Sequence, residues 1–369
     1  MFLLDERPHF TFERPVAAFA GRPPERRGVP RDRVRLLVAR SGPAGTEVAH
    51  TRFDRIDEHL TAGDVLVVND SATVAGAIDA VSDRHGAVVV HVATPLDDGT
   101  WVVEVRRAPD AERSVLDARA GDRLVLAAGR TTLRLVAPYP EAGSSPAGVG
   151  NRLWQARASG TSLDRTARAH GRPIAYGYLD ERFPLEDYQT LFARVPGSAE
   201  MASAARPFTP DLVARLVARG VVIAPITLHT GVSSQEAGEA PQAERFVVPR
   251  STADQVNLAR RRGRRVVAVG TSATRALESA IADGADGADG ADGDGRVVAA
   301  SGWTSRVVTP AHPPGVVDGL VTGWHDPGAS HLLLVEAVAG AELARAAYDA
   351  ASGSGYLWHE FGDSCLLLP

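Results

Sequence analysis

Residues 265–279 read RVVAVGTSATRALES. The apolar run at 265–269 predicts a buried strand, Gly270 allows a sharp turn, and the residues that follow predict a helix through position 282. In open α/β sheets, ligands bind beyond the carboxyl ends of the strands. Backbone N–H groups at the start of such a helix can hold a carboxylate or a phosphate. This segment therefore indicates an α/β fold with a candidate anion-binding turn.

Polar side chains follow this turn. Thr271 or Ser272 is expected to cap the helix, and both hydroxyls would add donors to the anion site. Arg275 and Glu278 lie three residues apart, so they are placed to form an ion pair on the helix surface. The residues alone leave two interpretations open, a ligand site or an ordinary capped helix with a surface ion pair.

Helices and strands alternate on both sides of this unit. Thr209 and Pro210 are typical of an N-cap and a first helical position, and Gly220 is typical of the end of that helix. The alternation predicts a mostly parallel sheet with flanking crossover helices. The other expected elements are strands at 221–229 and 316–322 and helices at 251–263, 330–338 and 341–351.

Residues 61–150 show a different pattern. Short apolar runs are separated by turn sequences such as Asp-Asp-Gly at 97–99 and Ala-Gly-Asp at 120–122. Many short strands at such spacing predict a small antiparallel β-barrel. Residues 143–150 are rich in glycine and serine and are expected to be the linker that leaves the barrel. The expected organisation is a discontinuous α/β domain, residues 1–60 and 151–369, interrupted by a barrel domain, residues 61–150.

Residues 282–295 repeat the triplet Ala-Asp-Gly. A calcium loop is one interpretation of this segment. However, the aspartates recur mostly every third residue instead of every second, and no glutamate closes the loop as in an EF-hand. We therefore expect a solvated, flexible loop.

Composition excludes several kinds of chemistry. All 40 basic residues of the 369-residue chain are arginine, so mechanisms that need a lysine, such as a pyridoxal Schiff base, are excluded. Cys365 is the single cysteine, which excludes internal disulfides and cysteine-ligated iron–sulfur clusters and fits a reducing cytoplasm. The histidines lack metal-ligand spacing, so no catalytic metal is expected. Neither a signal peptide nor a membrane-spanning run is predicted.

Three further polar residues stand at predicted strand ends or turns. His229 ends a buried strand before a glycine turn, where a histidine can act as a general acid or base or simply be hydrogen-bonded beneath a loop. His325 follows the strand at 316–322 in a similar way. Asp363 follows Gly362 and places a carboxylate on a predicted turn.

Several separate motifs occur in one order along the chain, and an ordered set is far more specific than any single motif. They are FTFERP (10–15), PPERR (23–27), LTAGDVLVVND (60–70), YQT (188–190), PGS (196–198), FT (208–209), TLHTG (227–231), VGTSATRALES (269–279), GWT (302–304), HDP (325–327) with Ser330, and GD (362–363). In this set and order they resemble the S-adenosylmethionine:tRNA ribosyltransferase-isomerase family of queuosine biosynthesis.

The resemblance implies an α/β catalytic domain interrupted by a β-barrel, in agreement with the strand pattern at 61–150. It also implies that the ribosyl moiety of S-adenosylmethionine is transferred to 7-aminomethyl-7-deazaguanine in tRNA and isomerised. The product would be epoxyqueuosine, with adenine and methionine released. S-adenosylmethionine would be a co-substrate and tRNA a partner, with no separate cofactor. We expect a cytoplasmic monomer without membrane contact.

The implied reaction indicates which side chains to examine. A base must remove a proton beside the sulfonium, and an acid helps adenine to leave. We assign acid–base catalysis to His229, with Asp363 or Glu244 as a further carboxylate. The predicted substrate-binding residues, which centre on the glycine turn, are Gly270, Thr271, Ser272, Arg275, Glu278, His325, Asn69 and Asp70.

Three positions differ from the family pattern. Ala72 stands where the family has an arginine, Pro207 stands where it has a histidine, and Gln242 stands where it has a second histidine. A proline cannot replace a histidine in proton transfer or in hydrogen bonding. Two alternatives therefore stay open, a related S-adenosylmethionine-using enzyme with a different acceptor and a non-catalytic binding protein of the same fold.

Binding of tRNA would need a local basic surface, because the formal net charge of the chain is −5. Two arginine clusters are candidates for this surface, and a merely solvated face is the alternative for both. The clusters are Arg22, Arg26, Arg27, Arg31, Arg33 and Arg35, and Arg260, Arg261, Arg262, Arg264 and Arg265.

Overall fold

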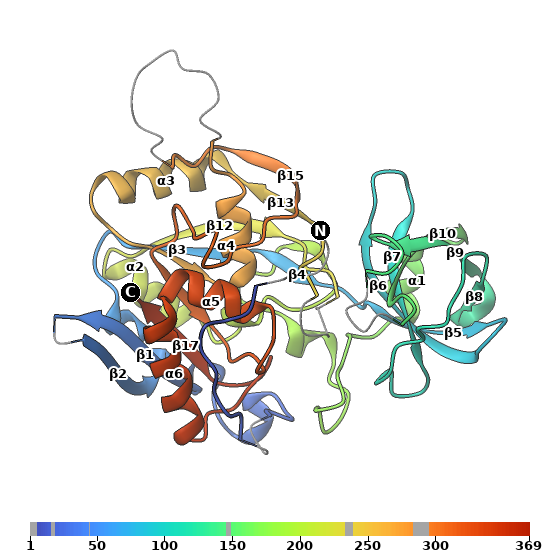
Figure 1. Ribbon diagram of the computed structural model, residues 1–369, viewed down its shortest axis with the longest axis horizontal. Helices are drawn as coiled ribbons and strands as arrows, with labels where there is room; N and C mark the ends of the chain where they lie inside the picture. Colours follow the sequence, from blue (N-terminus) through green and yellow to red (C-terminus); the bar gives the residue numbers. More distant parts are fainter. Residues whose placement is uncertain (1–5, 16–18, 44, 145–148, 233–238, 283–294) are drawn as a thin grey trace, which may run out of the picture.

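The computed structural model describes residues 6–15, 19–43, 45–144, 149–232, 239–282 and 295–369. A large mixed sheet with helices on both faces forms the body of the molecule, and a closed β-barrel projects from it (Figure 1). The predicted α/β fold with an inserted antiparallel barrel is therefore confirmed. No helix in the described ranges is long and apolar enough to cross a membrane.

The large sheet has the strand order β15-β13-β12-β3-β14-β16-β17-β1-β2. Parallel pairings join β12, β3, β14 and β16 at its centre and also join β17 to β1, and the remaining pairings are antiparallel. In chain order the strands are β1 (Arg35–Gly42), β2 (Gly45–Arg52), β3 (Val65–Asn69), β12 (Val222–Leu228), β13 (Glu244–Val248), β14 (Val266–Val269), β15 (Ala300–Thr304), β16 (Gly319–Thr322) and β17 (Ser364–Leu368).

Helices cover both faces of this sheet, because successive residues of a strand point to opposite sides. Val65 and Val67 of β3 pack into the cluster that contains side chains of α3, α4, α5 and α6, whereas Leu66 and Val68 pack into the cluster that contains side chains of α2. These helices are α2 (Pro210–Ala218), α3 (Arg250–Arg261), α4 (Thr271–Glu278), α5 (His331–Ala339) and α6 (Ala341–Gly353). Short 3-10 helices occupy Pro24–Arg27, Arg31–Arg33, Phe53–His59, Ala127–Gly129, Leu185–Tyr188 and Ser203–Ala205.

The barrel closes in the order β10-β7-β6-β5-β8-β9, and α1 (Leu163–His170) packs beside it. Its interior is apolar and contains Ile78, Val90, Val103, Leu133 and Trp154. The strands are β5 (Ala77–Ser82), β6 (Gly86–Pro95), β7 (Trp101–Arg107), β8 (Arg123–Leu126), β9 (Thr131–Tyr139) and β10 (Leu153–Gly160). A separate parallel pair joins β4 (Ser71–Thr73) to β11 (Val195–Ser198) beside the body.

The strand content of the barrel differs from the expected range 61–150 at both ends. β3 lies inside that range but is a central strand of the large sheet, and β10 lies after it but closes the barrel. The segment at 143–150 therefore connects two barrel strands instead of leaving the barrel. A continuous apolar strand such as β3, buried on both faces, is typical of a parallel sheet and not of a small barrel.

Two further expectations concern the segment around α4. The helix ends at Glu278 and not at position 282. Of the predicted Ala-Asp-Gly loop at 282–295, residues 283–294 lie outside the described residues.

Candidate active site

A cavity of about 840 Å³ opens at the carboxyl ends of the central strands, between the body and the barrel. Gly231 follows β12, Gly270 follows β14 and Gly323 follows β16, and all three line it. The barrel contributes Arg106 and Glu112. This is the edge of an open α/β sheet where ligands bind, and the volume is that of a small-molecule site.

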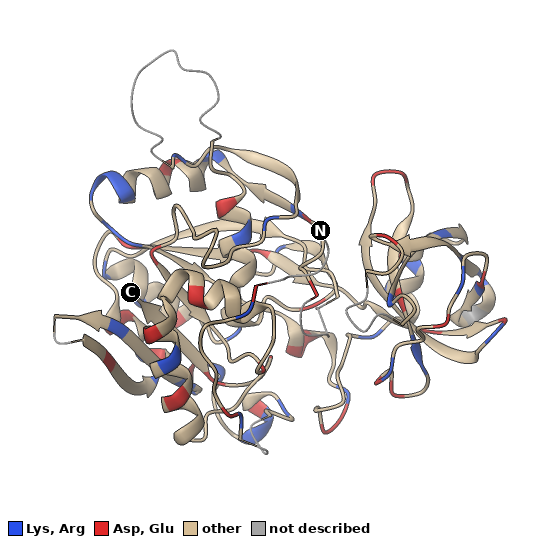
Figure 2. Cartoon of the chain, viewed as in Figure 1, with Lys and Arg blue, Asp and Glu red and all other residues tan. Residues whose placement is uncertain are grey.

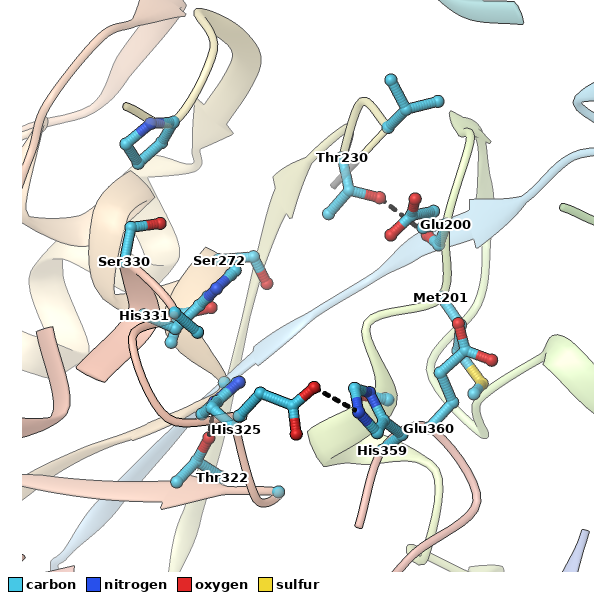
Figure 3. A pocket seen from close by; sticks show the side chains of 18 of the residues that line it. Glu200, Met201, Thr230, Ser272, Thr322, His325, Ser330, His331, His359 and Glu360 are labelled. Carbon is cyan, nitrogen blue, oxygen red and sulfur yellow. Dashed lines mark hydrogen bonds and ion pairs between the residues drawn. The ribbon is translucent and has the colours of Figure 1, made fainter. Parts of the chain in front are cut away.

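The cavity has two chemically different ends (Figure 3). Ser272, Ser330 and His331 lie toward one end, where α4 and α5 begin. Glu200 and Met201 lie on the opposite side. The described residues contain no group of three or more His, Cys, Asp or Glu side chains placed to hold a metal ion.

Gly270 makes the turn between β14 and α4. Its φ of 92° and ψ of 160° lie in a region of backbone conformation that is essentially restricted to glycine. Gly270 is itself the N-cap of α4, and no side chain caps the helix, so the prediction that Thr271 or Ser272 would cap it is wrong. Both residues line the cavity, and the N–H groups of the first helical turn lack intrahelical partners. The turn thus presents donors for an anion.

Arg275 pairs with Glu244 and not with Glu278, so the predicted ion pair within the helix is wrong. Its guanidinium also donates to the carbonyl oxygens of Arg306 (3.0 Å) and Gln242 (3.0 Å). Glu244 in turn accepts a hydrogen bond from the N–H of Gly231 (3.0 Å). We call the contacts of Arg275 and Glu244 with each other and with the backbone of Gly231, Gln242 and Arg306 the clamp. The clamp is buried and connects α4 to β13 and to segments that line the cavity.

Glu278 lies outside the cavity. Its carboxylate accepts hydrogen bonds from the backbone N–H groups of Gly315 (2.8 Å), Val316 (3.0 Å) and Val317 (3.0 Å), and the side chain is buried. The residue therefore fixes the segment before β16 and does not bind a ligand in the cavity.

His325, a predicted substrate-binding residue, lines the cavity beside a second histidine, His331, that was not predicted. Its ring stacks on that of His331, with centroids 4.8 Å apart and planes at 4°. Burial, together with the neighbouring histidines, holds the pKa of His325 well below its usual value, and burial lowers the pKa of His331 to about 4. Both imidazoles are therefore neutral near pH 7 and can donate and accept hydrogen bonds.

An aromatic wall forms another side of the cavity. The rings of Phe19, Tyr178 and His359 stack on one another, with centroid distances of 4.5–5.3 Å. All three residues line the cavity. A wall of this kind can stack on a planar ring and can face a cation.

Glu360 and Glu200 place two carboxyl groups at this side of the cavity. Burial, and next the nearby charge of Glu200, raises the pKa of Glu360 to about 8. The hydroxyl of Tyr176 donates a hydrogen bond to Glu200. Glu360 therefore carries a proton near neutral pH, as a general acid requires.

The raised pKa of Glu360 predicts a pH dependence of stability. Between about pH 4.5 and pH 8 the folded protein binds a proton that the unfolded chain has released, so the free energy of unfolding falls as pH rises across this window. We expect Glu360→Gln to flatten this part of the curve by about 5 kcal/mol. Urea unfolding of both proteins at closely spaced pH values measures it, and parallel curves would contradict the burial of this carboxyl group.

His229 does not line the cavity. Its Nδ1 lies 2.7 Å from the Ser71 hydroxyl, which in turn lies 2.6 Å from the Ser198 hydroxyl. A Cβ on Gly197 would lie only 2.6 Å from this nitrogen, so the ring is closely packed. Burial lowers the pKa of His229. The ring joins β12 to the β4–β11 pair behind Thr230, which does line the cavity.

Asn69 and Asp70 also lie behind the cavity. The Asn69 amide donates to the carbonyl of Leu228 (2.9 Å) and to the Ser272 hydroxyl (3.2 Å). Asp70 pairs with Arg194 (2.7 Å). Asn69 therefore positions Ser272, which does line the cavity, and neither of the two predicted substrate-binding side chains lines it itself.

The carboxylate of Asp363 accepts hydrogen bonds from backbone N–H groups. One carboxylate oxygen accepts from the N–H of Arg35 (2.8 Å) and the other accepts from the N–H of Leu357 (2.8 Å). The side chain is buried and does not line the large cavity, and burial raises its pKa. This geometry is typical of a residue that fixes the backbone just before β17, and it is not typical of a catalytic carboxylate.

Comparison with protein families identifies the chain. A family model described as a queuosine biosynthesis protein matches residues 7–367. The chain belongs to this family. The predicted resemblance is therefore confirmed over nearly the whole sequence.

Relatives in the queuosine biosynthesis family match the chain along its length. A Methylocella silvestris protein is 36% identical over 98% of this chain and 97% of its own length, and a Thermus thermophilus protein is 34% identical over 92% and 94%. Both are named S-adenosylmethionine:tRNA ribosyltransferase-isomerase. The solved structure of a Thermotoga maritima S-adenosylmethionine tRNA ribosyltransferase matches with a TM-score of 0.51 and 25% identity, covering 97% of this chain and 99% of that one.

In this member of the queuosine biosynthesis family, sequence patterns predicted residues on the turn side of the cavity but none of the residues on its aromatic and acidic side. Gly270, Thr271, Ser272, Arg275, Glu244 and His325 line the cavity as a group. The missed residues are Phe19, Tyr176, Tyr178, Glu200, His331, His359 and Glu360. Most of them stand in irregular segments without hydrophobic periodicity, and the stacked His331 was signalled only by its place at a helix start six residues after His325.

Proposed function

We propose that this protein transfers and isomerises the ribosyl moiety of S-adenosylmethionine onto a 7-aminomethyl-7-deazaguanine base of tRNA, with release of adenine and methionine. One observation carries the proposal: the strand–glycine–helix turn at Gly270 lies at a cavity of co-substrate size in a chain that matches the named ribosyltransferase-isomerases over nearly its full length. Queuosine biosynthesis is the function of the family to which the chain belongs.

The two sides of the cavity suit different parts of S-adenosylmethionine. The methionine carboxylate would accept hydrogen bonds from the first N–H groups of α4 and from the hydroxyls of Thr271 and Ser272. The adenine ring would stack on the Tyr178 and His359 part of the wall, because the Arg14 guanidinium already lies over the Phe19 ring, and the aromatic faces would also stabilise a nearby sulfonium. Arg275 would act by fixing α4 through Glu244, because its guanidinium is already fully engaged.

The proton transfers need an acid and a base within the cavity. Glu360 would protonate the departing adenine, since its raised pKa keeps a proton available near neutral pH. The neutral imidazole of His325 would accept the proton released beside the sulfonium. Both residues line the cavity.

The role of Glu360 predicts a particular pH profile. If the protonated form of Glu360 is needed, kcat falls as pH rises through about 8. Glu360→Gln should lower kcat on the order of 100-fold and should no longer show this fall at alkaline pH. The matched variant Glu200→Gln removes the charge that helps to raise the pKa of Glu360. The fall of kcat with rising pH should therefore begin at a lower pH in this variant. An unchanged profile in Glu360→Gln would exclude the residue as the acid.

For His229 we propose a positioning role. His229→Ala should lose more stability than the about 1 kcal/mol of one hydrogen bond, because the closely packed ring is removed as well, and should keep turnover within about tenfold. Ser71→Ala removes the hydrogen bonds of Ser71 to His229 and to Ser198 but keeps the ring, and it should also keep turnover within about tenfold. Urea unfolding and turnover measure both effects. A loss of about a thousandfold in His229→Ala alone, with the fold intact, would restore the predicted acid–base role.

The direct test of the function is adenine release from S-adenosylmethionine by the purified protein. We expect release only with tRNA that carries the 7-aminomethyl-7-deazaguanine base, with a matching gain of mass on that nucleoside. Release without tRNA would instead indicate hydrolysis or another acceptor. Absence of release under all conditions would favour a binding protein of the same fold.

A further inference from the structure

Three arginines form a row across neighbouring strands of the barrel. Arg134 on β9 lies directly opposite Arg123 on β8 and directly opposite Arg157 on β10. Side chains opposite one another in antiparallel strands have Cβ atoms roughly 4.5–5.5 Å apart. The row therefore places three cations side by side, and we call Arg123, Arg134 and Arg157 the arginine row.

The row lies on the outside of the barrel. Leu124, Leu133 and Ala156, which are the chain neighbours of the three arginines, are buried in the barrel interior. Successive residues of a strand alternate between its two faces, so the arginines point away from the interior. All three are exposed. Figure 2 shows blue arginine segments along several strands of the projecting barrel.

The charges of the row are not neutralised by close neighbours. Among the described residues, no carboxylate lies within 4 Å of any of the three guanidinium groups. The charge of Arg157 also acts on Asp98, whose pKa is lowered first by hydrogen bonds from Thr100 and to a smaller extent by Arg157.

The first arginine cluster predicted for RNA, at positions 22–35, differs in this respect. Arg22 pairs with Asp180 (2.7 Å), and Arg26 pairs with Asp187 (2.8 Å). Arg31 pairs with Glu25 (2.8 Å), so this cluster is largely occupied by intramolecular ion pairs. The arginine row is therefore better suited to an external anion.

The row costs stability, since like charges directly opposite one another in a sheet repel. In the part of the chain that the structure describes, no ion pair within 4 Å offsets this cost. A line of closely spaced guanidinium groups matches a chain of phosphates, because each guanidinium can bind a phosphate through two parallel hydrogen bonds. The row also starts on β10, the barrel neighbour of β7, and β7 carries Arg106 into the cavity wall.

We propose that the arginine row binds the phosphate backbone of the acceptor tRNA while the target base enters the cavity. This inference rests on the proposed function for the identity of the RNA. It places the RNA on the β8–β9–β10 face of the barrel, and the alternative to be tested is the exposed arginines at the ends of α3.

The test compares two triple variants with the same loss of charge. Arg123→Gln, Arg134→Gln and Arg157→Gln together remove the row. Arg250→Gln, Arg261→Gln and Arg262→Gln together remove exposed charges at the two ends of α3. The affinity of each protein for the precursor-bearing tRNA is measured by fluorescence anisotropy at several salt concentrations. Thermal unfolding of each protein is measured in parallel.

We expect the row variant to lose about 100-fold in tRNA affinity at low salt and to flatten the slope of log affinity against log salt by about 2. The α3 variant should stay within a few-fold of the unmodified protein. The unfolding temperature of the row variant should be unchanged or higher, because repulsion between like charges is removed. A structural role for the row would instead lower it.

Each outcome decides the inference. Equal tRNA affinity in the row variant, an equal loss in both variants, or no tRNA binding by the unmodified protein would overturn it. Selective loss of binding in the row variant would support it even if adenine release were absent. In that case the proposed function would fail while the RNA-binding surface would stand.

Discussion

Replacing Gly270 by valine is expected to abolish turnover. The backbone at this position has φ 92° and ψ 160°, which a β-branched residue cannot adopt without strain of about 1–3 kcal/mol. A Cβ there would also lie 3.3 Å from the Cβ of Ala204 across the cavity wall. Displacement of the α4 start by about 1 Å would cost on the order of 100-fold in rate through misplacement of the substrate alone.

Gly263→Val is the matched control for this substitution. Gly263 also has a positive φ, 61°, at the end of α3, but a Cβ there meets no atom within 4 Å. It should show a comparable loss of stability in thermal unfolding and normal adenine release. If Gly270→Val retained turnover within a few-fold of Gly263→Val, the turn would not be part of the active site.

Replacing Arg275 by methionine is expected to give the largest loss of stability. The substitution removes an ion pair and hydrogen bonds to three carbonyl groups, and it leaves the largely buried Glu244 carboxylate without its partner. Breaking a buried pair in this way typically costs about 3–5 kcal/mol. Turnover should fall in parallel, because α4 loses its connection to β13. Urea unfolding and adenine release measure the two effects.

A second substitution separates the charge from the packing. Adding Glu244→Gln to Arg275→Met removes the uncompensated carboxylate, so the double variant should recover part of the lost stability. Turnover should remain low, because the clamp stays broken. A loss below about 1 kcal/mol in Arg275→Met would show that the clamp does not stabilise this side of the cavity.

Local patterns were sufficient to predict the central structural unit. The strand, glycine and helix at 265–279 are encoded by adjacent residues, and the structure forms β14, Gly270 and α4 from them. The series of short strands also predicted the barrel, but the sequence pattern did not predict the residues at which the barrel begins and ends. Strand β3 belongs to the large sheet although only β4 separates it from the first barrel strand, because pairing with β12 and β14 places it at the centre of that sheet, where both of its faces are buried.

Long-range partners explain what the sequence could not predict about the site. The i,i+3 rule placed Glu278 beside Arg275, but three backbone N–H groups at 315–317 engage that carboxylate, and Arg275 reaches Glu244, 31 positions away. His359 and Glu360 precede β17 in a segment without regular periodicity, and their chemistry arises from burial beside Tyr178 and Glu200. Such environments exist only after the fold is complete.

The most direct test of the central claim is binding of radiolabelled S-adenosylmethionine at equilibrium, with saturating tRNA that lacks the precursor base so that no turnover occurs. The unmodified protein and Gly263→Val should each bind one equivalent, and Gly270→Val should show no saturable binding. Equal binding by Gly270→Val, or no saturable binding by the unmodified protein, would contradict the assignment of this cavity as the active site.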